Sequence, residues 1–103
     1  MTPTVRTIKH YEALGFTADV VERRITKRLT KDFLGCIDVI ALKAGEPPHF
    51  IQTTTGKNKA ARREKIRKCP SFAVLKATGK VILHGWHQRT DGTWTPREEE
   101  VRA

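Results

Sequence analysis

Short apolar runs separated by polar turns predict that residues 1–103 form one small domain. The N-terminal segment has the spacing of a helix, in which residues three or four positions apart share a face. Its shared face is expected to hold Val5, Ile8 and Tyr11 or Glu12. Thr2 or Thr4 can cap this helix, and Gly15 can end it after Leu14.

Five other segments are apolar or alternate between apolar and polar residues, and we predict that they are strands. They are residues 16–25, 36–43, 49–54, 81–88 and 93–101. Pro47 and Pro48 mark a turn because proline cannot continue a strand ladder, and Asp91-Gly92 favours a hairpin. The polar, basic segment 26–35 is predicted to be a connection.

Two more helices are predicted between the third and fourth strands. The first begins between Thr55 and Asn58 and ends before Pro70. The second covers residues 71–77 and is closed by Gly79. This order predicts an α/β or α+β layer with a mixed central sheet of about five strands, flanked by helices.

The charge of the chain indicates a polyanionic partner. Lys and Arg number 20 against 11 Asp and Glu, for a formal net charge of +9. Nucleic acid is the common partner for such an excess, because each neutralised phosphate releases counterions. A membrane partner is not expected, since no segment is both long and strongly amphipathic with an aromatic face, and no apolar run approaches the ~18 residues of a membrane span. The N-terminus has no apolar signal region, and the two cysteines lack C-x-x-C spacing, so we expect a cytoplasmic protein.

The predicted helix at 57–68 is the most basic segment, with seven basic residues in twelve. Only Ala60, Ala61 and Ile66 are expected to pack inward. We predict that the basic side chains contact the DNA backbone, which does not depend on base sequence. The alternative is an ordinary solvated face. The residues expected to bind DNA are Lys31, Lys57, Lys59, Arg62, Arg63 and Arg67.

Asp38 lies in a short apolar strand, and Gln52 lies on the next predicted strand. A buried carboxylate is costly unless something compensates its charge, and a metal ion is one such group. Residues two apart in a strand face the same way, so Asp38 and Gln52 can converge if their strands are neighbours. Carboxylate and amide oxygens suit a hard divalent ion, and the Thr53 carbonyl could add a third ligand. The alternative is that Asp38 and Gln52 only accept backbone N–H bonds.

The span 20–67 resembles the PD-(D/E)XK nuclease superfamily, and within it the small Holliday-junction-resolvase-like members. Those proteins place a helix before three strands, with an Asp in the second strand and Glu-x-Lys in the third. Here Asp38 takes the Asp position, Gln52 the Glu position and Thr54 the Lys position. The chain also resembles a group of small phage and bacterial proteins through four motifs. These are Lys31-Asp32-Phe33-Leu34-Gly35, Gln52-Thr53-Thr54, Arg62-Arg63-Glu64-Lys65 and His84-Gly85-Trp86.

The resemblance implies a restriction-endonuclease-like core and an endonuclease that uses Mg²⁺ or Mn²⁺ to hydrolyse branched or otherwise structured DNA. It also implies a homodimer with two sites for two strands, in a bacterial cell or a phage-infected host. Since Gln52 lacks a charge, Glu22 or Asp32 is expected to complete the metal site, in preference to Glu12.

Thr54 is not a lysine, so the resemblance also needs another catalytic cation. Lys57 or Lys65 is expected to take that role. The simple alternatives are that Glu22 pairs with a neighbouring arginine, that Asp32 is a turn residue and that both lysines are solvated surface cations.

Two other functions are consistent with the sequence. The first is a nuclease fold that has lost catalysis and binds DNA without cleaving it, which the Gln52 and Thr54 replacements favour. The second is an accessory factor that binds RNA or protein without a metal. His84 and His87 could contribute to a zinc site, but the sequence has no Cys/His set with zinc spacing. His84 and Trp86 are therefore expected to pack in the sheet or to contact DNA.

Overall fold

The computed structural model describes residues 1–27 and 30–102, and its described part contains a five-stranded mixed sheet. The strand order is β1-β4-β5-β6-β7. β5 and β6 are parallel, and the other neighbours are antiparallel. The strands are β1 (Thr17–Val20), β4 (Val39–Leu42), β5 (His49–Thr55), β6 (Lys80–Gln88) and β7 (Trp94–Glu100). The α/β class and the mixed sheet of about five strands are thus confirmed.

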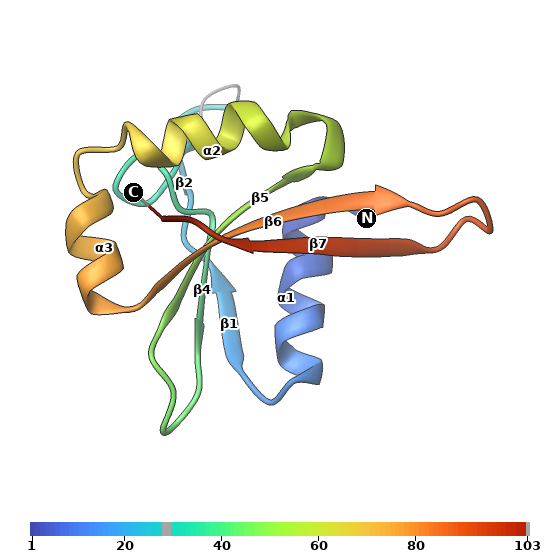
Figure 1. The fold of residues 1–103 in the computed structure, drawn as a ribbon, viewed down its shortest axis with the longest axis horizontal. Coiled ribbons are helices and arrows are strands. Elements are labelled where there is room, and N and C mark those ends of the chain that lie inside the picture. The colour runs from blue at the N-terminus through green and yellow to red at the C-terminus, as the bar shows by residue number, and fades with distance from the viewer. Residues whose placement is uncertain (28–29, 103) are drawn as a thin grey trace.

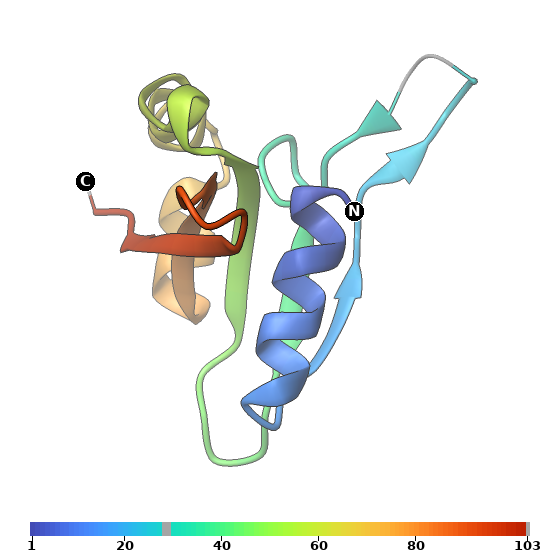
Figure 2. The same cartoon turned by 90° about the vertical axis from the view of Figure 1, so that its right-hand side faces the viewer.

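Helices cover both faces of this sheet (Figures 1 and 2). α1 (Pro3–Ala13) lies on one face, and α2 (Lys59–Arg67) and α3 (Phe72–Thr78) lie on the other. A 3₁₀ turn, η1 (Gly56–Asn58), leads from β5 into α2. Parallel strands need a crossover connection, and η1, α2 and α3 form the one between β5 and β6. β6 and β7 then form a hairpin that projects from the body of the molecule (Figure 1).

Each face of the sheet has its own apolar cluster. Beneath α1 the buried side chains are Tyr11, Val39, Ala41, Ile51 and Ile82. Beneath α2 and α3 they are Cys36, Ile37, Phe50, Ile66, Phe72, Leu75, Val81, Leu83 and Val101. The alternation of faces along β5 decides which cluster a residue joins, with Phe50 on the α2 side and Ile51 on the α1 side. Gln52 therefore follows Phe50 onto the α2 side.

The N-terminal helix begins and ends as predicted, but its buried face differs. Thr2 caps it by accepting a hydrogen bond from the backbone N–H of Val5 at 3.2 Å, and Gly15 follows with a φ of 89°. Tyr11 is buried as expected. Val5 is 41% exposed, whereas Thr7 is fully buried. The expectation for Val5 was wrong because Thr7 occupies the face toward the sheet, where it bonds to polar groups of β6.

The pattern predicted one strand over residues 16–25, and this prediction was wrong. β1 ends at Val20, opposite Val39 at the start of β4, so the sheet offers it no further partner. Val21 still donates its backbone N–H to the Asp38 carbonyl at 2.8 Å. The chain then leaves the sheet, and β2 (Arg23–Arg24) pairs with β3 (Thr30–Lys31). These two short strands form a projecting arm between β1 and β4 (Figure 2).

The basic helix runs close to its predicted range, but the expected inward face was partly wrong. Ile66 is fully buried, whereas Ala60 and Ala61 are exposed. Lys59 and Arg63 lie on the same helical face as Ile66, at the spacing of four and three residues. Their long stems, rather than the alanines, cover the region toward β7. Among the described residues, no helix combines the length and apolar character needed to cross a bilayer.

Candidate metal centre

Asp38 lies immediately before β4, because that strand begins three residues later than the predicted strand 36–43, and backbone bonds hold Asp38 on both sides. Its N–H donates to the Ile51 carbonyl at 2.9 Å, and its own carbonyl accepts from Val21 at 2.8 Å. The antiparallel register pairs Val39 with Ile51, so one step further places Asp38 opposite Gln52. Asp38 is buried and only 5% exposed.

The Asp38 carboxylate meets Gln52 and Thr53, as the strand pattern predicted for Gln52. Its Oδ2 accepts hydrogen bonds from Gln52 Nε2 at 2.5 Å, from the Thr53 N–H at 2.9 Å and from Thr53 Oγ1 at 3.2 Å. The second of these is the backbone bond that the simpler interpretation expected. Three donors on one oxygen hold the carboxylate rigidly, so its other oxygen has a fixed direction.

The carbonyl oxygen of the Gln52 side chain is buried without a partner among the described residues. Gln52 is 2% exposed, and its Oε1 accepts no hydrogen bond. An unsatisfied buried amide oxygen costs about 1–3 kcal/mol. Such an oxygen is a legitimate ligand for a hard cation, or an acceptor for a water bound to one. The residues present therefore fit a divalent ion at this point.

Glu22 and Asp32 join Asp38 through the projecting arm. The pairing of β2 with β3 places Arg23 opposite Lys31, and the residues just outside that pair, Glu22 and Asp32, meet at the base of the arm. One carboxylate oxygen from each of Glu22, Asp32 and Asp38 lies within 4.8 Å of the others. Glu12 lies elsewhere, exposed on α1. Both acids that the sequence favoured are thus brought to the site.

Three carboxylates this close repel one another, and this repulsion adds to the effect of burial on Asp38. The pKa of Asp38 is raised to about 7, first by burial, and then by the hydrogen bond to Asp32 and the charges of Asp32 and Glu22. Lys65 reaches in from α2, with its Nζ 2.6 Å from Asp32 Oδ2. One ammonium cannot balance three carboxylates, so a divalent cation is the natural complement.

These groups line an open cavity of about 600 Å³. Acids and the Gln52 amide lie beside cations of α2 and of the arm. Thr54, which follows Gln52 by two positions on β5, also lines the cavity. The cations in its wall are Lys31, Arg62 and Lys65. A negatively charged phosphate and a metal ion could therefore be held side by side here.

The two candidate lysines lie in different places. Lys65 lines the acidic cavity, whereas Lys57 lines a separate groove with Trp86 and Trp94 near the β6–β7 hairpin. The geometry therefore makes Lys65 the candidate for a catalytic cation. Lys57 is exposed and remains a candidate for contact with DNA away from the acids.

The other basic residues expected to bind DNA differ in whether a carboxylate already binds them. Arg63 is held by Glu99 through two bonds, at 2.6 and 2.7 Å, and Lys59 lies 3.4 Å from the same carboxylate. Arg67 contacts Glu64 at 3.2 Å. Arg62 lines the cavity instead. Arg63 and Lys59 thus link α2 to β7. The sequence did not predict this structural role, because it does not show that β7 lies beside the helix.

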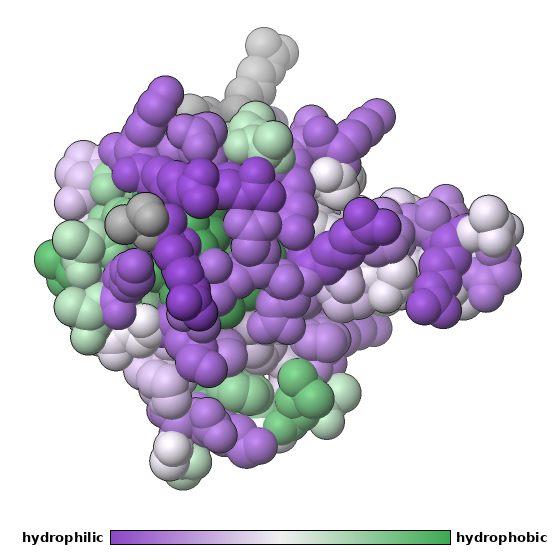
Figure 3. Space-filling model, in the orientation of Figure 1, coloured by the Kyte–Doolittle hydropathy of each residue, from purple (hydrophilic) through white to green (hydrophobic). Residues whose placement is uncertain are grey.

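The projecting arm adds basic residues that the sequence analysis did not single out. Arg23, Arg24 and Lys27 are exposed there, next to Lys31. The sequence shows these residues as a basic run in the segment 23–31. Only the pairing of β2 with β3 places that run beside the acids. The surface over α2 and along the β6–β7 hairpin is also strongly hydrophilic (Figure 3).

Comparison of the chain with protein-family models, curated proteins and solved structures found no match. Its function has to be inferred from its own residues.

Proposed function

We propose that the chain is a Mg²⁺- or Mn²⁺-dependent endonuclease that hydrolyses phosphodiesters in structured DNA. The observation that carries the proposal is the meeting of Glu22, Asp32 and Asp38 within 4.8 Å, next to the buried and unpartnered Gln52 Oε1. Neither feature alone would suffice. Together they form an oxygen-only set of the kind that hard divalent ions prefer, in an open cavity walled by cations.

The order of elements supports the restriction-endonuclease-like assignment. The helix α1 precedes three antiparallel strands of the sheet, β1, β4 and β5. Asp38 immediately precedes the second of these strands and Gln52 lies within the third, close to the positions of the acids in the nuclease superfamily that the sequence resembles. Thr54 shares the cavity with Gln52, and Lys65 enters from α2 to replace the missing lysine.

Each residue has a defined part in this hydrolysis. Asp38, Asp32 and Glu22 hold the cation, and Gln52 contributes a neutral oxygen. A divalent ion held there would supply the chemistry of a lowered water pKa and of a stabilised charge on the leaving oxygen. Arg62 and Lys65 bind the phosphate oxygens and stabilise the charge that develops on them. The water oxygen forms a bond to phosphorus, the bond from phosphorus to the sugar oxygen breaks, and the departing oxygen takes up a proton.

The surroundings support DNA as the substrate. The exposed cations of the arm and α2 lie on either side of the cavity and can follow a phosphate backbone without reading bases. A chain of 103 residues offers a small footprint, and a homodimer would bring two such cavities to the two strands of a branched substrate. We place this activity in the cytoplasm of a bacterial cell or phage-infected host.

The test is cleavage of branched and linear DNA with Mg²⁺, Mn²⁺ or EDTA. Asp38→Asn keeps the volume and the acceptor oxygen but removes the charge, so cleavage should fall by about 100-fold or more. Asp19→Asn is the matched control, because Asp19 is an exposed β1 acid whose carboxylate accepts a hydrogen bond from the N–H of its neighbour Val20. Wild-type rates in Asp38→Asn would remove Asp38 from the mechanism.

A second candidate is a nuclease fold that binds DNA without cleaving it. It is favoured by Gln52, which brings no charge to the site and uses its Nε2 to occupy Asp38 Oδ2. This reading predicts DNA binding by the wild type with no metal-dependent cleavage of any substrate. Preference for duplex RNA over DNA in the same binding assay would point instead to an RNA-binding accessory factor.

A further inference from the structure

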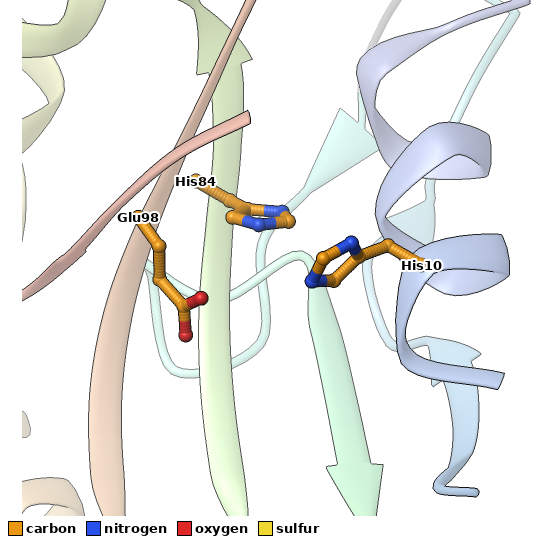
Figure 4. Close-up of side chains that lie close together, drawn as sticks. All are labelled: His10, His84 and Glu98. Carbon is orange, nitrogen blue, oxygen red and sulfur yellow. The ribbon is translucent and has the colours of Figure 1, made fainter. Parts of the chain in front are cut away.

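On the α1 face of the sheet, His10, His84 and Glu98 converge from three different elements (Figure 4). His84 of β6 and Glu98 of β7 are direct partners in the antiparallel register, so both side chains lie on the same face. His10 lies one helical turn after Thr7 on α1 and faces them. One ligand atom from each of the three residues lies within 4.8 Å of the others.

His84 is prepared to act as a ligand. It is fully buried, and its Nε2 has no hydrogen-bond partner among the described residues. Its other ring nitrogen, Nδ1, lies 2.8 Å from Thr7 Oγ1. When Nδ1–H donates to that hydroxyl oxygen, Nε2 keeps its lone pair free. Metal-binding histidines commonly donate their second N–H in this way, which fixes the ring and the tautomer.

Thr7 is itself held in place. Its Oγ1 accepts a hydrogen bond from Trp86 Nε1 at 2.8 Å, and a hydroxyl oxygen has two lone pairs, so it can accept from His84 as well. Thr7 is fully buried. Trp86 therefore fixes the Thr7 hydroxyl, and Thr7 fixes the orientation of the His84 ring through Nδ1. Residues that contact metal ligands commonly orient them in this way.

The charges of the three groups suit a transition metal. Burial, with a smaller contribution from the charges of His10 and Lys59, lowers the pKa of His84 to about 4. The His84 ring is therefore neutral at neutral pH. The exposed Glu98 supplies an anion, which also contributes to raising the pKa of the buried Tyr11 hydroxyl nearby. Two imidazoles and one carboxylate are ligands that favour Zn²⁺ over Mg²⁺.

The spacing allows a metal ion with a modest adjustment. Zn–N distances of about 2.0–2.1 Å imply ligand atoms roughly 3.3 Å apart in a tetrahedral site. The adjustment falls on the half-buried His10 and the exposed Glu98, because His84 is fully buried. Three protein ligands leave the fourth position for water, as in catalytic rather than structural zinc sites.

We propose that His10, His84 and Glu98 form a second metal site that takes Zn²⁺ or a similar late first-row divalent ion. It is separate from the carboxylate centre, whose α1 residues, Pro3 and Thr4, lie about two turns before His10. A metal here joins α1 to β6 and β7, three elements distant in sequence. The site stands on its own contacts and does not depend on the nuclease activity.

The experiment is a Zn²⁺ titration of the chelator-treated chain, prepared without a histidine tag, followed by calorimetry and by thermal unfolding. We expect one Zn²⁺ per chain and a higher unfolding temperature. Co²⁺ in place of Zn²⁺ should give the visible absorption of a tetrahedral site. His10→Gln and Glu98→Gln each remove one ligand at a position that is not fully buried, and each should weaken Zn²⁺ binding by about tenfold or more.

Matched variants separate this site from other sources of binding. Two control variants should bind Zn²⁺ as the wild type does. His87→Gln changes a β6 histidine that lines a different groove, and Glu100→Gln changes an exposed acid of β7. Asp38→Asn should also keep full Zn²⁺ affinity, even if it abolishes DNA cleavage. The proposal is overturned if the wild type binds no Zn²⁺ at about 10 μM, where a specific site would be filled. It is equally overturned if His10→Gln or Glu98→Gln keeps full affinity.

Discussion

Gln52 Nε2 donates a hydrogen bond of 2.5 Å to Asp38 Oδ2. The bond joins two buried residues that are 14 positions apart in sequence. The bond commits the Gln52 amide nitrogen to Asp38, and the Gln52 carbonyl oxygen is left without a partner among the described residues. Gln52 thus does two things at once. Its nitrogen compensates a buried carboxylate, and its oxygen is available to a cation.

Replacing Gln52 with Glu should make folding depend on metal. The new carboxylate would be buried beside Asp38 and near Asp32 and Glu22, at a cost of about 3 kcal/mol when no cation is present. A bound Mn²⁺ should recover most of that loss and strengthen its own binding. The measurement is urea unfolding of Gln52→Glu in EDTA and in Mn²⁺. Gln88→Glu, at an exposed position, is the control, and an equal stability of Gln52→Glu in both conditions would argue against a cation at this site.

Lys65 and Lys57 give a direct comparison of the two lysines considered for catalysis. Lys65 Nζ bonds Asp32 and lines the acidic cavity, whereas Lys57 lines the groove beside Trp94. Lys65→Met should lower kcat for DNA cleavage by about 100-fold with a smaller change in KM, because its charge acts on the developing phosphate charge. Lys57→Met should leave kcat within about threefold and affect mainly KM. A larger kcat loss in Lys57→Met than in Lys65→Met would assign the role to Lys57.

The core of the candidate metal centre could be predicted because it depends on local patterns. The two-residue period of strands, together with the turn at Pro47 and Pro48, makes neighbouring strands of 36–43 and 49–54 the simplest arrangement. That arrangement alone brings Asp38 to Gln52, as the register confirms. The basic helix and the final hairpin were predictable for the same reason, since their signals lie within a few residues of one another.

The remaining contacts depend on pairings between elements that no local pattern encodes. Glu22 and Asp32 meet only because β2 pairs with β3, two short strands with no apolar alternation. Arg63 meets Glu99 because α2 packs beside β7. The sequence showed the basic residues of the helix as equivalent, and their different partners appear only with the tertiary structure.

Arg62 and Arg63 are adjacent in sequence, but replacing each of them with alanine should have different effects. Arg62 lines the cavity, so Arg62→Ala should weaken DNA binding and reduce the slope of its salt dependence by about one, with little change in stability. Arg63 bonds Glu99 twice, so Arg63→Ala should lower the urea concentration at the unfolding midpoint while affecting DNA binding less. The measurements are DNA affinity at several salt concentrations and urea unfolding. A larger loss of affinity in Arg63→Ala would mean that the pair with Glu99 opens to release the arginine for DNA.

The bond between Arg63 and Glu99 also predicts how stability depends on acid. Hydrogen bonds from Arg63 lower the pKa of Glu99 from an ordinary 4.5 to about 2, and Lys59 contributes further. Because the folded-state pKa lies below the unfolded value, the pair stabilises the fold fully above about pH 4.5, and this contribution is lost as the pH falls toward 2.

Wild-type protein should therefore lose more stability between pH 5 and about pH 2.5 than Glu99→Gln does, while above pH 5 the two should differ by a constant amount. Urea unfolding across this range measures both curves, and Glu100→Gln, a neighbouring exposed acid, serves as the control. Parallel curves for the wild type and Glu99→Gln down to the lowest pH would show that Glu99 titrates alike in the folded and unfolded chains. The fastening of α2 to β7 by Arg63 would then contribute little to the fold, and Arg63 would be free to serve the DNA surface instead.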